Sequence, residues 1–140
     1  MTLSKSRFYA LSFTWGIIMT LIGCIVSMVL IALGYKPIKN RYGWYFIVGG
    51  DWGGALDLGP ASIVCENPTE HLLQHEFGHA VQNCYYGPAF PFIVAIPSAI
   101  RYWYREYLVC SGKKQYNELP PYDSIWFEGM ATELGGLYEK

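Results

Sequence analysis

“ENPTEHLLQHEFGHAVQNCYYGP”, residues 66–88, has the boundary signals of one helix and carries the sequence HEFGH inside it. Asn67 suits the N-cap, Pro68 suits the first helical position, and Gly87 followed by Pro88 suits the end of a helix. Apolar residues recur at helical spacing along the segment, as expected of a face that packs on a core. We therefore predict a helix over about residues 68–86.

The HEFGH sequence predicts a zinc site with its own general base. His75 and His79 lie one turn apart on the same helical face, so both imidazoles can bind one zinc ion. Glu76 lies about 100° round the helix from His75, where it can reach a zinc-bound water without binding the metal. Zinc lowers the pKa of that water to about 7, and a carboxylate can take its proton. The alternative is an ordinary helix with packed or solvated histidines.

A third zinc ligand must come from another element, because two histidines do not complete the site. His71 lies about 12 Å from His79 along the helix axis, so it is expected outside the ligand set. Cys84 projects from a different side of the helix. Glu128 is the favoured ligand, because it lies between bulky apolar residues and a buried carboxylate needs a partner. The other carboxylates compared with it are Glu106, Glu118, Asp123 and Glu133.

The N-terminal segment has the composition of a membrane anchor. Residues 8–33 carry no charge and would form a helix of about 39 Å, longer than the roughly 30 Å hydrocarbon core. A signal-peptide core is shorter, about 7 to 15 residues. We therefore expect residues 1–34 to be a single-pass transmembrane anchor and residues 35–140 to be the catalytic domain. The lysines and arginines flanking the span favour, by a small margin, a cytoplasmic catalytic domain.

The rest of the chain predicts an α+β domain. “GWYFIVGG” (43–50) and “ASIVC” (61–65) have strand composition and predict a small antiparallel sheet, with a turn-rich segment between them. The apolar run 88–100 contains Pro91 and Pro97, and is either a re-entrant or interfacial segment or a buried loop. Ser98 is a candidate cap for the helix that follows. A final helix is expected to begin at Asp123 or Ser124 and to stop at Gly135–Gly136.

“HEFGHAVQ” (75–82) followed by “WFEGMA” (126–131) resembles the gluzincin branch of zinc metallopeptidases. The resemblance implies a minimal zincin-like domain in which His75, His79 and Glu128 bind zinc and Glu76 is the general base. Many gluzincins carry an acidic residue four positions after the ligand glutamate, whereas this chain has Thr132 there, with Glu133 beside it. Residues 43–135 are also similar to small, uncharacterised bacterial membrane proteins with a HEFGH or HEYGH core.

These features predict a membrane-anchored zinc metallopeptidase with one zinc ion per chain and a peptide or protein substrate. Three protein ligands leave a fourth position open for water, whereas structural zinc sites fill all four. One alternative is a non-catalytic zinc-binding or interaction module of a membrane complex. The other is an intramembrane, site-2-type protease, against which the polar residues of the motif helix argue. The net charge of −1 gives no reason to expect nucleic acid as a partner. No transition-state donor is singled out among Tyr85, Tyr86, Tyr116, Tyr122 and His71.

Overall fold

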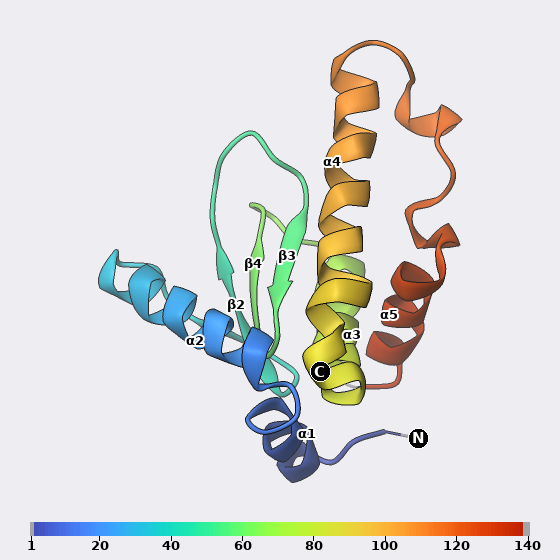
Figure 1. The fold of residues 1–140 in the computed structure, drawn as a ribbon. Coiled ribbons are helices and arrows are strands. Elements are labelled where there is room, and N and C mark those ends of the chain that lie inside the picture. Colours follow the sequence, from blue (N-terminus) through green and yellow to red (C-terminus); the bar gives the residue numbers. More distant parts are fainter. Residues whose placement is uncertain (1, 139–140) are drawn as a thin grey trace.

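Five α-helices and a four-stranded sheet make up residues 2–138, which are the residues that the computed structural model describes (Figure 1). The helices are α1 (Lys5–Ser12), α2 (Ile17–Ala32), α3 (Glu70–Tyr86), α4 (Ile96–Cys110) and α5 (Trp126–Gly136). The strands are β1 (Ile38–Asn40), β2 (Gly43–Ile47), β3 (Ala55–Leu58) and β4 (Ala61–Val64). Short 3-10 turns cover Gly87–Ala89, Tyr116–Glu118 and Tyr122–Ser124, and a π-helical turn covers Pro91–Ala95. The prediction of an α+β fold is confirmed.

The sheet is mixed, so the prediction of an antiparallel sheet is wrong. Its strand order is β1-β2-β4-β3, in which β4 lies parallel to β2 and antiparallel to β3. β3 lies in the segment that was expected to be a turn, and it occupies the outer edge of the sheet. The tight turn at Gly59, with φ of 74°, then returns β4 to the place beside β2.

The motif helix α3 ends as predicted but begins later than expected. Gly87 follows it with φ of 54°, a conformation that glycine adopts without strain. At the other end Thr69, not Asn67, is the N-cap, because the Thr69 hydroxyl accepts a hydrogen bond from the Leu72 amide at 3.1 Å. Asn67 has a φ of 54° and turns the chain into the helix.

α5 packs directly against α3, with glycine at the points where their backbones meet. A Cβ atom on Gly78 would lie 1.7 Å from the carbonyl oxygen of Ala131. A Cβ atom on Gly135 would lie 1.8 Å from the carbonyl oxygen of Gln74. This close approach explains Gly78 inside a helix, where glycine costs about 1 kcal/mol relative to alanine. α5 begins after Ile125 rather than at the expected Asp123 or Ser124.

Residues 8–33 do not form the single helix that was predicted. The chain turns at residues 13–16, and the axes of α1 and α2 differ by 93°. None of the described helices is long and apolar enough to cross a bilayer by itself, although α1 and α2 taken together pass on length and composition. The break is held by α3, since the Asn83 side-chain amide donates to the Gly16 carbonyl at 3.2 Å. Such a tertiary contact has no signal in the hydropathy of the segment.

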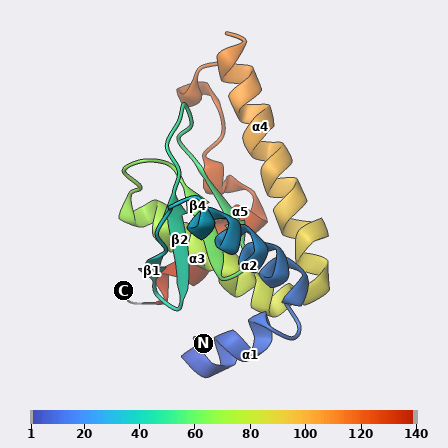
Figure 2. The same ribbon diagram turned by 90° about the vertical axis from the view of Figure 1, so that its left-hand side faces the viewer.

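The remaining elements surround α3. α5 packs along α3, and α4 begins near the C-terminal end of α3 and runs away from it (Figure 1), while α2 lies across the β3–β4 hairpin (Figure 2). The apolar run 88–100 is helical, and it buries Phe90 and Val94 against Met19 of α2. Ser98 lies inside α4, so the expectation that it caps this helix is wrong. Its side chain instead donates a hydrogen bond to Glu128 of α5.

Candidate metal centre

Three buried ligand-type side chains converge between α3 and α5. Glu128 Oε2 lies 2.9 Å from His75 Nε2 and 3.2 Å from His79 Nε2. The ligand atoms of the three residues all lie within 4.8 Å of one another. Each residue is at most 5% exposed, and Glu128 is fully buried. This group could hold a metal ion, and it contains the three residues that the sequence analysis selected as ligands.

Hydrogen bonds at the far side of each imidazole direct a lone pair at the centre. Thr132 donates its hydroxyl proton to Asp123 Oδ2 at 2.7 Å, so the hydroxyl oxygen accepts from His75 Nδ1 at 2.8 Å. Gln82 donates its amide to the Phe127 carbonyl, so its Oε1 accepts from His79 Nδ1 at 2.7 Å. In both residues Nδ1 therefore carries a proton, and Nε2 points at Glu128 Oε2, where it can bind a metal in place of a proton.

The metal-free cluster holds a proton in the place where a cation would bind. Burial opposes a charge on His79, but its hydrogen bond to Glu128 and the charges of Glu76 and Glu128 raise its pKa to about 9. Burial likewise opposes ionisation of Glu128, yet hydrogen bonds from both histidines hold its pKa well below the usual range. Ser98 from α4 donates to the other oxygen, Oε1, and so fixes the orientation of the carboxylate. A divalent cation would replace the shared proton.

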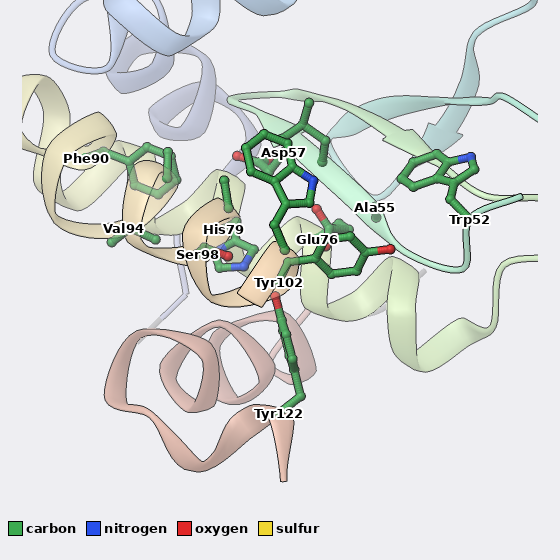
Figure 3. Close-up of a pocket in the computed structure, with 14 residues that line it drawn as sticks. Trp52, Ala55, Asp57, Glu76, His79, Phe90, Val94, Ser98, Tyr102 and Tyr122 are labelled. Atoms are coloured by element: carbon green, nitrogen blue, oxygen red, sulfur yellow. The ribbon is translucent and has the colours of Figure 1, made fainter. Parts of the chain in front are cut away.

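Glu76 lies beside this cluster and faces a cavity rather than the three ligand atoms. The cavity has a volume of about 270 Å³ and lies between β3 and α4, where Glu76, His79 and Asp57 line it (Figure 3). Burial raises the pKa of Glu76, although the two neighbouring histidines partly offset the effect. Burial also raises the pKa of Asp57. A carboxylate with a raised pKa in a closed site is suited to accept and return a proton near neutral pH.

Tyr122 stands at the entrance of the same site. It lines the cavity beside Glu76, and its ring centroid is 6.1 Å from that of His75. Burial, reinforced by the charge of Glu128, raises the pKa of Tyr122 far above its usual range, so the phenol keeps its proton. Of the tyrosines considered in the sequence, Tyr116 lies instead at the surface and donates to Glu106. The spacing of these residues held no signal that distinguished Tyr122.

The other candidates lie outside the cluster. His71 is exposed, and its Nε2 is 3.9 Å from Asp123 Oδ2. Cys84 is buried next to Ser12, and burial raises its pKa to about 11. Glu118 and Glu133 are exposed. Three residues that contact the cluster were not recognised from the sequence, namely Gln82, Ser98 and Thr132. Ser98 was expected to cap a helix, and Thr132 was considered only as a departure from an acidic residue.

No protein-family model, curated protein or solved structure matches this chain significantly. The chemical interpretation of the cluster therefore depends on its own geometry.

Proposed function

We propose that this chain is a membrane-associated, zinc-dependent hydrolase that cleaves an amide bond of a peptide or protein substrate. The observation that carries the proposal is the convergence of His75, His79 and Glu128 on one point, with the buried carboxylate of Glu76 beside it. Two imidazoles and one carboxylate form a ligand set found in catalytic zinc sites, where a fourth position stays open. The Nε2 atoms of both histidines, once deprotonated, fit this set.

In the proposed reaction, each residue around the cluster has a separate role in amide hydrolysis. A bound zinc ion supplies Lewis acidity, which polarises a substrate carbonyl and makes water more acidic. Glu76 accepts a proton from the attacking water as its oxygen bonds to the carbonyl carbon. The same carboxyl group returns that proton to the amide nitrogen as the carbon–nitrogen bond breaks. Tyr122, which keeps its proton, donates a hydrogen bond to the oxygen on which negative charge develops.

The first experiment measures metal content and hydrolysis in the same preparations. Full-length protein purified in detergent and loaded with zinc is analysed for zinc per chain, then incubated with a mixed peptide library. New amino termini are identified by mass spectrometry. Glu76→Gln is expected to keep the zinc and to lose at least about 100-fold in rate, because a general base is removed without removing a ligand. Glu133→Gln, on the exposed side of α5, is the matched control.

Each outcome bears on a different part of the proposal. Zinc near one per chain with Glu76-dependent cleavage supports it. Zinc near zero after reconstitution contradicts the metal site. One zinc per chain without any cleavage contradicts the hydrolase and favours the alternative of a non-catalytic zinc-binding module.

A further inference from the structure

α2 presents its apolar side outward and its polar side inward. Its buried residues are Met19, Thr20, Gly23 and Ser27. Ser27 accepts a hydrogen bond from the Trp44 indole at 2.9 Å, and a Cβ atom on Gly23 would lie 2.1 Å from the Leu58 carbonyl oxygen. The exposed side carries large apolar residues, namely Ile17, Ile18, Leu21, Ile22, Ile25, Met28, Val29, Ile31 and Leu33. This polarity is the reverse of a helix on a water-soluble domain.

The outward face of α2 is too broad for a single helical partner. At about 100° per residue, its exposed positions cover roughly 200° of the helix circumference. One neighbouring helix contacts a much narrower seam. A medium that surrounds the helix, such as lipid acyl chains, covers an arc of this width.

α4 has the same reversed polarity. On its inner side, Arg101 donates to the carbonyls of Pro121 and Tyr122 at 3.1 and 3.0 Å, and Ser98 donates to Glu128. On its outer side, an exposed stripe consists of Ile96, Ile100, Trp103, Tyr104 and Tyr107. Aliphatic residues come first and aromatic residues follow, before Lys113 and Lys114 in the next loop. This order matches the passage from hydrocarbon through the bilayer interface to water.

α2 and the α4 segment meet at one end. Met19 of α2 packs with Phe90 and Val94 at the start of the α4 segment. Figure 2 accordingly shows the first turns of α2 beside that end of α4. α2 is also followed by exposed lysines, Lys36 and Lys39. Lysines therefore follow both apolar faces, where they would meet anionic lipid headgroups.

Two cavities meet at Glu76, and they differ in what lies around them. The cavity of about 270 Å³ reaches the outer stripe of α4 at Trp103, and Leu56, which is 46% exposed, also lines it. A second cavity of about 490 Å³ lies on the other side of Glu76, where His71, Arg105, Glu106 and Asp123 are among its lining residues. Glu76, Tyr102 and Tyr122 line both cavities. The proposed general base thus lies between a cavity that reaches the exposed stripe of α4 and a cavity that charged side chains line.

We propose that the outward faces of α2 and α4 are embedded in the lipid bilayer, and that the two cavities at Glu76 receive a polypeptide segment where it leaves the bilayer for water. The apolar part of the segment lies in the cavity beside Trp103, and the polar part lies in the cavity beside Arg105. The scissile bond then lies at Glu76, within reach of water from the polar side. The substrate class rests on the hydrolase function proposed above, whereas the membrane placement does not.

Cysteine labelling tests the placement without any activity. Single cysteines at Leu21, Ile100 and Ser111 are introduced into full-length protein that carries Cys24→Ala and Cys110→Ser, which leaves the two buried thiols. The protein is reconstituted in vesicles of phosphatidylethanolamine and phosphatidylglycerol at less than one chain per vesicle, and a membrane-impermeant maleimide is added. Ser111, just past α4, is the matched control. Leu21→Cys and Ile100→Cys are expected to react at least about tenfold more slowly than Ser111→Cys, because the reactive thiolate forms poorly in hydrocarbon.

The labelling has three informative results. Protection at less than one chain per vesicle supports embedding in lipid. Equal labelling at all three positions overturns it. Protection that appears only at high protein density assigns these faces to a second copy of the chain, and also overturns the proposal.

A pair of peptides tests the substrate class. One has a polyleucine transmembrane segment followed by a hydrophilic tail, and the other is the tail alone. Zinc-loaded protein in the same vesicles is expected to cut the tethered peptide within a few residues of the leucines, about tenfold or more faster than the free tail. Glu76→Gln is expected to cut neither. Equal rates contradict the substrate class, whereas no cleavage of either peptide contradicts the hydrolase function while the labelling result stands.

Discussion

Gly78→Ala tests whether the spacing between α3 and α5 sets the metal centre. The new methyl group would lie 1.7 Å from the Ala131 carbonyl oxygen and 2.5 Å from its carbonyl carbon, whereas ordinary contacts begin at 3.4 Å. Both obstructing atoms are backbone, so no rotamer change relieves the contact. The helices must therefore separate by about 1.7 Å at this point, or the substituted turn must distort by a similar amount.

The consequence for stability is a net loss. Overpacking of this kind costs about 1–3 kcal/mol and sometimes more. Alanine regains about 1 kcal/mol over glycine inside a helix. The backbone clash should exceed that gain, and we expect a lower thermal unfolding midpoint for the metal-free protein.

The consequence for zinc binding is larger. Glu128 lies one turn before Ala131 on α5, and its Oε2 is held 2.9 and 3.2 Å from the two histidine nitrogens. Metal–ligand distances tolerate deviations of only about 0.2 Å. A helix displacement above about 1 Å therefore removes Glu128 as a ligand, and we expect zinc affinity to fall at least about 100-fold.

Zinc affinity is measured by competition with a chromophoric chelator. Gly53→Ala is the matched control, because a Cβ atom there meets nothing within 4 Å and its φ is not positive. It should bind zinc like the wild type. Wild-type affinity in Gly78→Ala would refute the view that this backbone contact places Glu128.

Four further results are expected. Thr132→Val removes the acceptor for His75 Nδ1 and should weaken zinc binding about 10- to 100-fold, while Thr132→Ser restores it in the same chelator competition. Zinc must displace the proton of His79, so its affinity should rise about tenfold per pH unit up to the pKa of about 9. The rise in the pKa of His79, from a usual value of 6.5 to about 9, also affects the stability of the metal-free protein. The stability that His79 contributes is expected to be fully present below about pH 6.5 and to be lost as pH rises through 9. Thermal unfolding midpoints measured across this pH range test the prediction. His71→Ala should leave zinc content unchanged in elemental analysis, since His71 is exposed and outside the ligand group.

Local signals were sufficient for the motif helix and for the choice of Glu128. The end of α3 could be predicted because Gly87 has a positive φ there, a conformation that glycine adopts without strain. The predicted start, with Asn67 as the N-cap, was wrong, because Thr69 is also a residue type suited to capping and the fold selects Thr69. Glu128 could be selected because a carboxylate among apolar residues is costly to bury without a partner. That argument concerns a single residue and its environment.

The features that could not be predicted depend on contacts between distant segments. The break before α2 needs Asn83, which lies 67 residues away from Gly16 in the chain. The parallel pairing of β2 and β4 leaves β3 at the outer edge, although β3 is a short strand with turn residues on both sides. Ser98 reaches Glu128 only because a π-helical turn before α4 carries the chain across the site. The spacing of apolar residues and the helix or strand propensities of single residues carry no information about these contacts between distant segments.

Position 132, where the resemblance to gluzincins implies an acidic residue, holds a threonine that forms a hydrogen-bond relay. In the resemblance to gluzincins, an acidic side chain four positions after the ligand glutamate is oriented towards a ligand histidine. Here Thr132 accepts from His75 and donates to Asp123, so a carboxylate still ends the hydrogen-bond chain, one side chain further from the metal centre. Because the Thr132 hydroxyl has one proton, its donation to Asp123 obliges it to accept from His75. The relay thus places the His75 proton on Nδ1, while the negative charge lies further from the imidazole, on the partly exposed Asp123.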